Sequence, residues 1–326
     1  MNVFSAMAAL PALIRPLAAM KPVPLLVSWC LTEKCNLTCA HCAIHRNPRP
    51  EIGTREVLAV IDRLRAAGTR IISFSGGETL MRHDIAAILD YCGRRGIRTR
   101  VTSNGLLVPR KIDSIASLDV LKLSVDGTKE THEAMRGPGS FGALHAAIAS
   151  ASQRRMKVVF STALTEINMK DCLFVLDLAA QHDTVATFQP LERRRGLDER
   201  QYCGLMPDIA AYRRLISFLM TEKAAGNRHI GNSLPGLYQL WRWPAPHRVA
   251  CHAGKWFLHV TTEGKLLACD RMVLGINPLQ DGAIESLRRI PLSPEHCEAC
   301  WKNNTLELNL ALSGNLSAIR NMLTWK

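Results

Sequence analysis

The chain has 326 residues, of which 47% are hydrophobic and 21% charged, a composition typical of folded globular proteins that excludes extensive disorder. This length suffices for one large domain and a small appendage. Lys and Arg (41) outnumber Asp and Glu (28), which gives a formal net charge of +13 and predicts an anionic partner. Because the positive charges are spread along the chain, we expect no dedicated nucleic-acid-binding region.

Residues 1–24 form an apolar N-terminal segment that Pro11, Arg15 and Pro16 interrupt. No run reaches the length of a transmembrane helix, and the segment lacks the basic start of a secretory signal. We therefore expect a cytoplasmic protein with reduced thiols, whose N-terminal segment either packs on the body or contacts a membrane surface.

Residues 25–190 alternate between apolar runs typical of buried strands and segments with helical periodicity. Six such alternations predict an α/β fold with a parallel sheet, closed only partly, as a (β/α)6 TIM-like barrel. The expected strands are 25–29, 70–75, 97–103, 120–125, 157–164 and 184–189, and the expected helices are 54–68, 83–96, 109–117, 141–155 and 169–182.

The remainder divides into three further parts. A connector at 191–250 carries two predicted helices, near 208–225 and 234–242. It is followed by a small cysteine-bearing domain at 251–303 and a terminal helix at 304–326.

Polar or glycine-rich turns follow the first four strands, in the segments 35–42, 76–78, 103–105 and 125–127. In parallel α/β sheets, ligands bind at the carboxyl ends of the strands. The sequence therefore predicts an active site on this rim.

Three cysteines, Cys35, Cys39 and Cys42, lie in one loop after the first strand. Thiolates suit zinc or iron–sulfur clusters. A zinc site would need a fourth ligand such as His41 or His45, and zinc motifs usually pair two cysteine knuckles or add two histidines. A single loop with three cysteines is unlike these zinc motifs, and its spacing leaves open what fills the fourth position.

Together with Gly76-Gly77-Glu78 after the second strand, the pattern Cys35-x3-Cys39-x2-Cys42 resembles the radical S-adenosylmethionine (SAM) superfamily over residues 25–190. The resemblance implies a [4Fe–4S] cluster on three thiolates, with SAM on the fourth iron. It also implies that an electron, delivered by a flavodoxin or ferredoxin, cleaves SAM to a 5′-deoxyadenosyl radical, which then abstracts a hydrogen atom.

The same resemblance assigns the SAM contacts. Gly76 and Gly77 would let the backbone approach the methionine moiety and Glu78 would accept from its ammonium, although Thr79 stands where the family often has proline. Without the cysteines, Asn104-Gly105 and Asp126-Gly127 would simply indicate turns. The implied SAM-binding residues are Gly76, Gly77, Glu78, Asn104, Ser124, Asp126 and Arg136. Of these, Ser124 and Asp126 would contact the ribose, and Arg136 would contact the carboxylate.

A second set of cysteines comprises Cys251, Cys269, Cys297 and Cys300. Four thiolates could close a zinc site. After a radical SAM barrel, however, the pattern is similar to the twitch domain, a shortened SPASM domain, which implies one auxiliary [4Fe–4S] cluster and two clusters in total. The segment 257–270 predicts a hairpin around Glu263-Gly264, with Cys269 on its return strand.

The auxiliary cluster suggests oxidation, in which a base removes a proton from the substrate radical. The resemblance points to Asp270 as this base, and Glu192, His252 and Glu263 are the other candidates. We expect a radical SAM oxidoreductase of dehydrogenase type that acts on a small or medium-sized anionic molecule. The alternatives are a peptide maturase and a noncatalytic zinc-binding scaffold.

Overall fold

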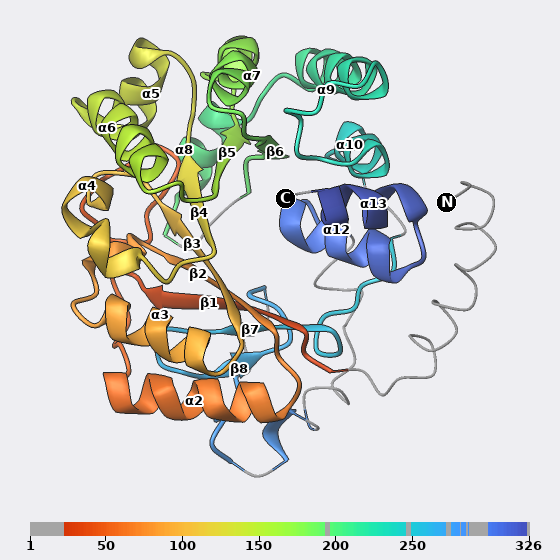
Figure 1. Ribbon diagram of the computed structural model, residues 1–326. Helices are drawn as coiled ribbons and strands as arrows, with labels where there is room; N and C mark the ends of the chain where they lie inside the picture. Colours follow the sequence, from red (N-terminus) through yellow and green to blue (C-terminus); the bar gives the residue numbers. More distant parts are fainter. Residues whose placement is uncertain are drawn as a thin grey trace.

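The computed structural model describes residues 23–192, 196–245, 249–271, 275–280, 282–284, 286 and 299–324 (Figure 1). The expectations for the N-terminal segment up to residue 22 and for Cys297 lie outside these described residues.

An eight-stranded sheet with the order β6-β5-β4-β3-β2-β1-β7-β8 organises the fold. Neighbouring strands from β6 through β1 to β7 run parallel, and only β8 is antiparallel, to β7. This confirms the predicted α/β class. The strands are β1 Leu26–Thr32, β2 Ile71–Gly76, β3 Arg98–Ser103, β4 Val120–Ser124, β5 Val158–Leu164, β6 Ala186–Pro190, β7 Phe257–Val260 and β8 Leu266–Leu267.

Helices follow the first five strands and cover one face of the sheet, whereas the C-terminal helices lie on the other side (Figure 1). The helices and 3-10 turns are α2 Thr54–Ala66, η1 Thr79–Met81, α3 Ile85–Arg94, α4 Val108–Lys111, η2 Asp113–Ile115, α5 Lys129–Arg136, α6 Ser140–Gln153, η3 Met169–Asp171, α7 Cys172–Gln181, α8 Glu199–Leu205, α9 Ile209–Ala224, α10 Leu234–Trp241, α12 Asn303–Leu312 and α13 Leu316–Thr324.

Apolar periodicity explains how the outer helices attach. In α2, the buried side chains Val57, Val60, Ile61 and Leu64 recur at helical spacing. They join one core with the outward-facing residues of the strands, among them Leu121. Fully burying each such side chain contributes about 1.5–3 kcal/mol. This packing holds the strand ends, and therefore the site at the rim, in fixed positions.

The C-terminal region contacts the sheet at both of its ends. Its hairpin adds β7 beside β1, with Leu26 in register with Phe257. At the other end, the Asn303 amide donates to the side chain of Gln189 in β6 over 3.3 Å. The hairpin confirms the expected turn at Glu263-Gly264, but Cys269 lies two residues beyond β8 rather than on the return strand.

The structure differs from the sequence expectations at several helices. The single helix expected at 304–326 is two helices, α12 and α13, with a break at Gly314, whose φ of 83° favours glycine. The segment 109–117 is the short α4 followed by the 3-10 turn η2, and α5 was expected only as a ligand-bearing segment. Among the helices in the described ranges, none is both long enough and apolar enough to cross a membrane.

Candidate active site

The glycine turn after β2 packs directly on the segment that leads into the cysteine loop. The Gly77 amide donates to the Thr32 carbonyl and the Glu78 amide to the Lys34 carbonyl, each over 2.8 Å. A Cβ on Gly76 would lie 2.0 Å from the Thr32 oxygen, and one on Gly77 would lie 2.1 Å from the Lys34 oxygen. Both glycines therefore permit the close approach of two loops, a role that the sequence analysis did not assign.

The cysteine trio lies on this loop at the end of β1, and all three thiols are partly exposed and form no disulfide. The backbone places them through two hydrogen bonds, from Cys42 N to the Cys39 carbonyl and from Ala40 N to the Met135 carbonyl in α5. Burial raises the pKa of Cys35 and raises that of Cys39 to about 11. A metal would stabilise the thiolates, because coordination deprotonates a thiol outright.

Glu78 connects the second and third rim turns. Its side chain is fully buried, and its carboxylate accepts hydrogen bonds from Leu80 N over 3.0 Å and from Asn104 N over 2.8 Å. Desolvation nevertheless raises the pKa of Glu78. Each carboxylate oxygen has two lone pairs, so Glu78 keeps acceptor capacity beyond these two amides.

Asn104 extends from the turn after β3 toward the cysteine loop. Its Nδ2 donates to Asn36 Oδ1 over 2.8 Å and lies 4.0 Å from Cys35 Sγ. Asn36 was missed by the sequence analysis, because no motif marks it; its position next to Cys35 is the only available signal.

Arg136 and Asp126 form a buried ion pair at the same rim. Arg136 Nε donates to Asp126 Oδ2 over 2.6 Å, and its Nη1 lies 4.0 Å from Cys39 Sγ. Burial alone would raise the pKa of Asp126, but the positive charges around it, of which Arg136 is the strongest, lower that pKa overall. The other oxygen of Asp126 is buried without a hydrogen-bond partner in the described part of the chain.

The structure therefore brings most of the predicted SAM-binding residues together beside the trio. Ser124 ends β4 on the same rim and is partly exposed. Asp126 pairs with Arg136 through one carboxylate oxygen, and its expected contact with the ribose stays a prediction. The sequence analysis also missed the pair of Glu33 and Arg49, in which Arg49 Nε donates over 2.9 Å to the carboxylate of Glu33, two residues before Cys35.

The donor set suits a cluster better than a single metal ion. Within the described ranges, no three His, Cys, Asp or Glu side chains are close enough to hold one ion. A cube-type cluster does not require such convergence, since each thiolate binds a different iron. Asn104 and Arg136 also direct N–H groups at two of the sulfurs, as donors around iron–sulfur sites do.

The second cysteine set is only partly described. Cys269 and Cys300 lie close enough for their charges to interact, and burial raises the pKa of Cys300. The candidate base Asp270 has its Oδ1 3.3 Å from Cys269 Sγ and forms an ion pair with Lys302. Glu192 pairs with Arg271 over 2.7 Å, so two of the candidate bases are bound by cations.

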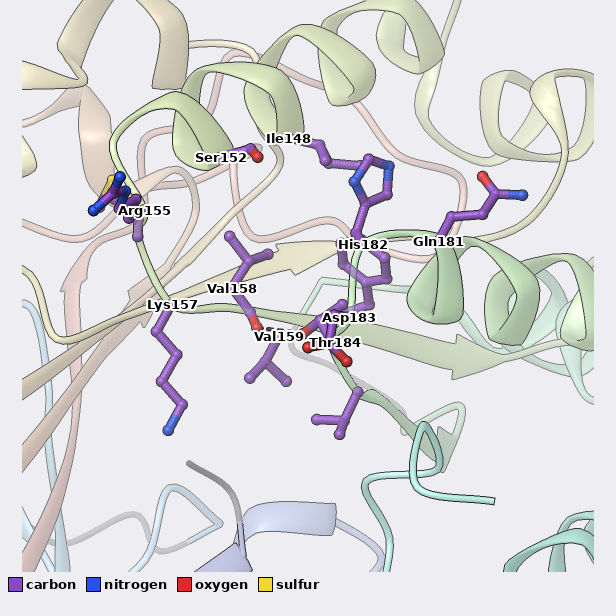
Figure 2. Close-up of a pocket in the computed structure, with 13 residues that line it drawn as sticks. Ile148, Ser152, Arg155, Lys157, Val158, Val159, Gln181, His182, Asp183 and Thr184 are labelled. Carbon is purple, nitrogen blue, oxygen red and sulfur yellow. Dashed lines mark hydrogen bonds between the residues drawn. The ribbon is translucent and has the colours of Figure 1, made fainter. Parts of the chain in front are cut away.

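A cavity of about 460 Å³ lies at the amino end of β5, opposite to the rim that carries the cysteines. It is lined by residues of α6, β5 and the loop after α7. Figure 2 shows His182 and Ser152 on one side of β5 and Lys157 on the other. None of the predicted site residues lines this cavity, so it is separate from the cysteine rim.

Comparison with known proteins identifies the rim. Residues 29–179, which include the cysteine trio, the glycine turn and Arg136, match the Radical SAM superfamily. Residues 29–179 therefore form a radical SAM domain. This match confirms the expected cofactors, SAM and iron–sulfur clusters of the [4Fe–4S] type.

Curated radical SAM relatives extend the likeness to different degrees. The chain is 34% identical to an AdoMet-dependent heme synthase of Methanosarcina barkeri over 52% of its length. That alignment spans only half of the synthase, so this likeness leaves the rest of that enzyme unmatched. A mycofactocin maturase of Mycolicibacterium smegmatis is 26% identical over 89% of this chain and 79% of its own.

Among solved structures, SuiB of Streptococcus suis bound to S-adenosylmethionine shares the fold, with a TM-score of 0.67 and 16% identity over 89% of this chain and 71% of SuiB. Both this match and the maturase match continue past residue 179 into the C-terminal region. They confirm a radical SAM domain followed by a C-terminal auxiliary domain.

Proposed function

We propose that this radical SAM enzyme modifies a peptide. The observation that carries the proposal is the extent of the maturase likeness, which runs over 89% of the chain and includes the C-terminal region. The heme-synthase likenesses cover less of the chain, between 45% and 68% of it. The proposal replaces our expectation of a small-molecule substrate, although the oxidative outcome is retained.

Each part of the rim has a role in this proposal. Cys35, Cys39 and Cys42 would hold the SAM-binding cluster, which would supply the electron for cleavage of SAM. Arg136 binds the SAM carboxylate with the N–H groups that Asp126 leaves unused, and Asp126 fixes the plane of the guanidinium through its 2.6 Å hydrogen bond. Glu78 accepts from the SAM ammonium, and Ser124 lies at the ribose.

The cysteine loop also needs the glycine turn. Backbone contacts from Gly77 and Glu78 fix the residues just before Cys35. Asn104, positioned by Glu78, donates toward the Cys35 sulfur. These contacts orient the thiolates before any cofactor binds.

The second cysteine set holds the auxiliary cluster, with Cys251, Cys269, Cys297 and Cys300 as its ligands. Full ligation by four thiolates would make it an electron acceptor or a structural element. Asp270, next to Cys269, takes the proton from the substrate radical, and Lys302 orients its carboxylate through their ion pair.

The test uses anaerobically reconstituted full-length enzyme with SAM and dithionite. Its probes are the precursor peptides of the mycofactocin maturase and of SuiB, and, as the competing substrate class, an iron porphyrin that carries carboxylates. We expect 5′-deoxyadenosine formation to rise with a peptide and mass spectrometry to show a changed peptide mass. Modification of the porphyrin with both peptides unchanged would contradict the proposal.

A further inference from the structure

Four cationic side chains share one face of the central strands. In the parallel register, residues paired across neighbouring strands point to the same side, as do residues two apart along a strand. Arg100 pairs with Val120, which lies two residues before Lys122, and Lys122 pairs with Val159. Arg98 lies two residues before Arg100, and Lys157 lies two residues before Val159. The four cations Arg98, Arg100, Lys122 and Lys157 therefore project from one face.

This is the inner face of the sheet, turned away from the covering helices. The intervening residues Val101, Leu121 and Leu123 are fully buried in the core that the outer helices share. Figure 2 shows the alternation on β5, with Lys157 and Val159 on one side and Val158 on the side of α6. The C-terminal helices lie on the inner side (Figure 1).

Two of these cations, Arg100 and Lys122, have no acidic partner within the described ranges. Arg98 contacts Asp119, with 3.4 Å between Nε and Oδ1. Within the described part of the chain, Arg100 and Lys122 form neither an ion pair nor a hydrogen bond.

Neighbouring cations on this face lower one another's pKa. Burial, followed by the charge of Arg100, lowers the pKa of Lys122 to about 8. Burial and the charge of Arg98 likewise lower the pKa of Arg100. Half-buried cations that repel each other are stabilised when an anion binds between them.

The position of Lys122 relates this face to the active-site rim. It precedes Ser124 by two residues on β4, which places the two Cα atoms roughly 7 Å apart along the strand. A substrate group beside Lys122 would therefore lie next to the rim at which SAM is cleaved. Arg136 is separate, because it lies on α5 and pairs with Asp126.

We propose that Arg100 and Lys122 bind a carboxylate of the substrate, so that the peptide presents either an acidic side chain or its C-terminal carboxylate to the inner face of the sheet. This inference rests on the proposed peptide-modifying function and names the substrate class of the same site. A paired guanidinium and ammonium suit a carboxylate, because charged hydrogen bonds are stronger than neutral ones.

The experiment measures binding of three acetylated tetrapeptides to reconstituted enzyme with SAM bound. Amidated tetraglutamate carries side-chain carboxylates, tetraglutamine with a free terminus carries only the terminal carboxylate, and amidated tetraglutamine is neutral. Isothermal titration compares the wild type with Lys122→Gln and Arg100→Gln. The matched control is Arg55→Gln, which removes an exposed cation from α2 on the outer side.

We expect the wild type to prefer one of the two anionic peptides over the neutral one, which also identifies the source of the carboxylate. Each inner-face variant should lower that affinity about tenfold, which corresponds to about 1.4 kcal/mol, because it removes a charged hydrogen bond. Lys122→Arg should restore binding, and Arg55→Gln should leave it unchanged. Iron content and melting temperature verify that each variant folds, and Lys122→Arg carries the test if Lys122→Gln does not.

Equal binding of all three peptides, or equal losses in Arg55→Gln and Lys122→Gln, would overturn the inference. So would a Lys122 variant whose only defect is a raised apparent KM for SAM, since that result would assign the lysine to the cofactor. Failure of the proposed function looks different: the wild type would then form no 5′-deoxyadenosine, or would modify only the porphyrin.

Discussion

At the scale of single residues, the site depends on contacts that a motif does not reveal. The sequence indicates that Gly76, Gly77 and Glu78 belong near the cysteines, and the structure places them there. The sequence cannot show that the Lys34 carbonyl occupies the space that a Gly77 Cβ would need, because that contact joins two loops far apart in sequence. The role of Asp126 as the partner of Arg136 was missed for the same reason.

Replacing Gly77 should therefore disturb the cysteine loop. A methyl group 2.1 Å from a backbone oxygen forces the loops apart, so Gly77→Ala should lower the iron bound per chain severalfold and slow SAM cleavage. Gly93→Ala on α3 is the matched control, because its added methyl meets nothing within 4 Å. Iron content after anaerobic reconstitution decides, and full loading of Gly77→Ala would contradict the account.

At the scale of elements, hydrophobic periodicity predicts the six strands of the barrel and most of its helices. Five of the six β1–β6 strands begin within one residue of the expected position, because buried strands leave a strong apolar signal. Short polar helices leave a weak one: α5 has eight residues and buries Thr131, His132, Met135 and Arg136. The break between α12 and α13 was also missed, since Gly314 alone does not reveal whether a helix continues.

The junction of α12 with α10 gives a prediction about pH. Burial raises the pKa of Glu307 to about 7, only partly offset by hydrogen bonds from Ser233 and by the charge of Lys223. The folded state then binds more protons than the unfolded state between the two pKa values. The contribution of Glu307 to stability should therefore fall as pH rises from about 4.5 to 7 and stay constant above, by a few kcal/mol in total.

Urea unfolding between pH 5 and 8 measures this contribution. The free energy of unfolding of Glu307→Gln should lose that part of the pH dependence, whereas Glu130→Gln, at an exposed position on α5, should follow the wild type. Identical pH profiles for Glu307→Gln and the wild type would show that Glu307 does not titrate in this range.

At the scale of the whole molecule, the C-terminal region is joined to the barrel by the sheet itself. Because β7 pairs with β1, the hairpin that precedes Cys269 is fixed relative to the strand that precedes Cys35. Spacing of cysteines predicts two metal sites, but it cannot predict that both are built on one sheet. Because one sheet carries both segments, the distance that an electron would travel between the two proposed clusters is fixed.

The measurement that tests the central claim most directly is the yield of 5′-deoxyadenosine from SAM and dithionite, after anaerobic reconstitution of four proteins. We expect formation by the wild type and by the control Cys203→Ala, which lies outside both cysteine sets, and none by Cys35→Ala. Cys269→Ala should still cleave SAM but release no modified peptide, provided that its melting temperature shows an intact fold. Undiminished 5′-deoxyadenosine formation by Cys35→Ala would contradict the account.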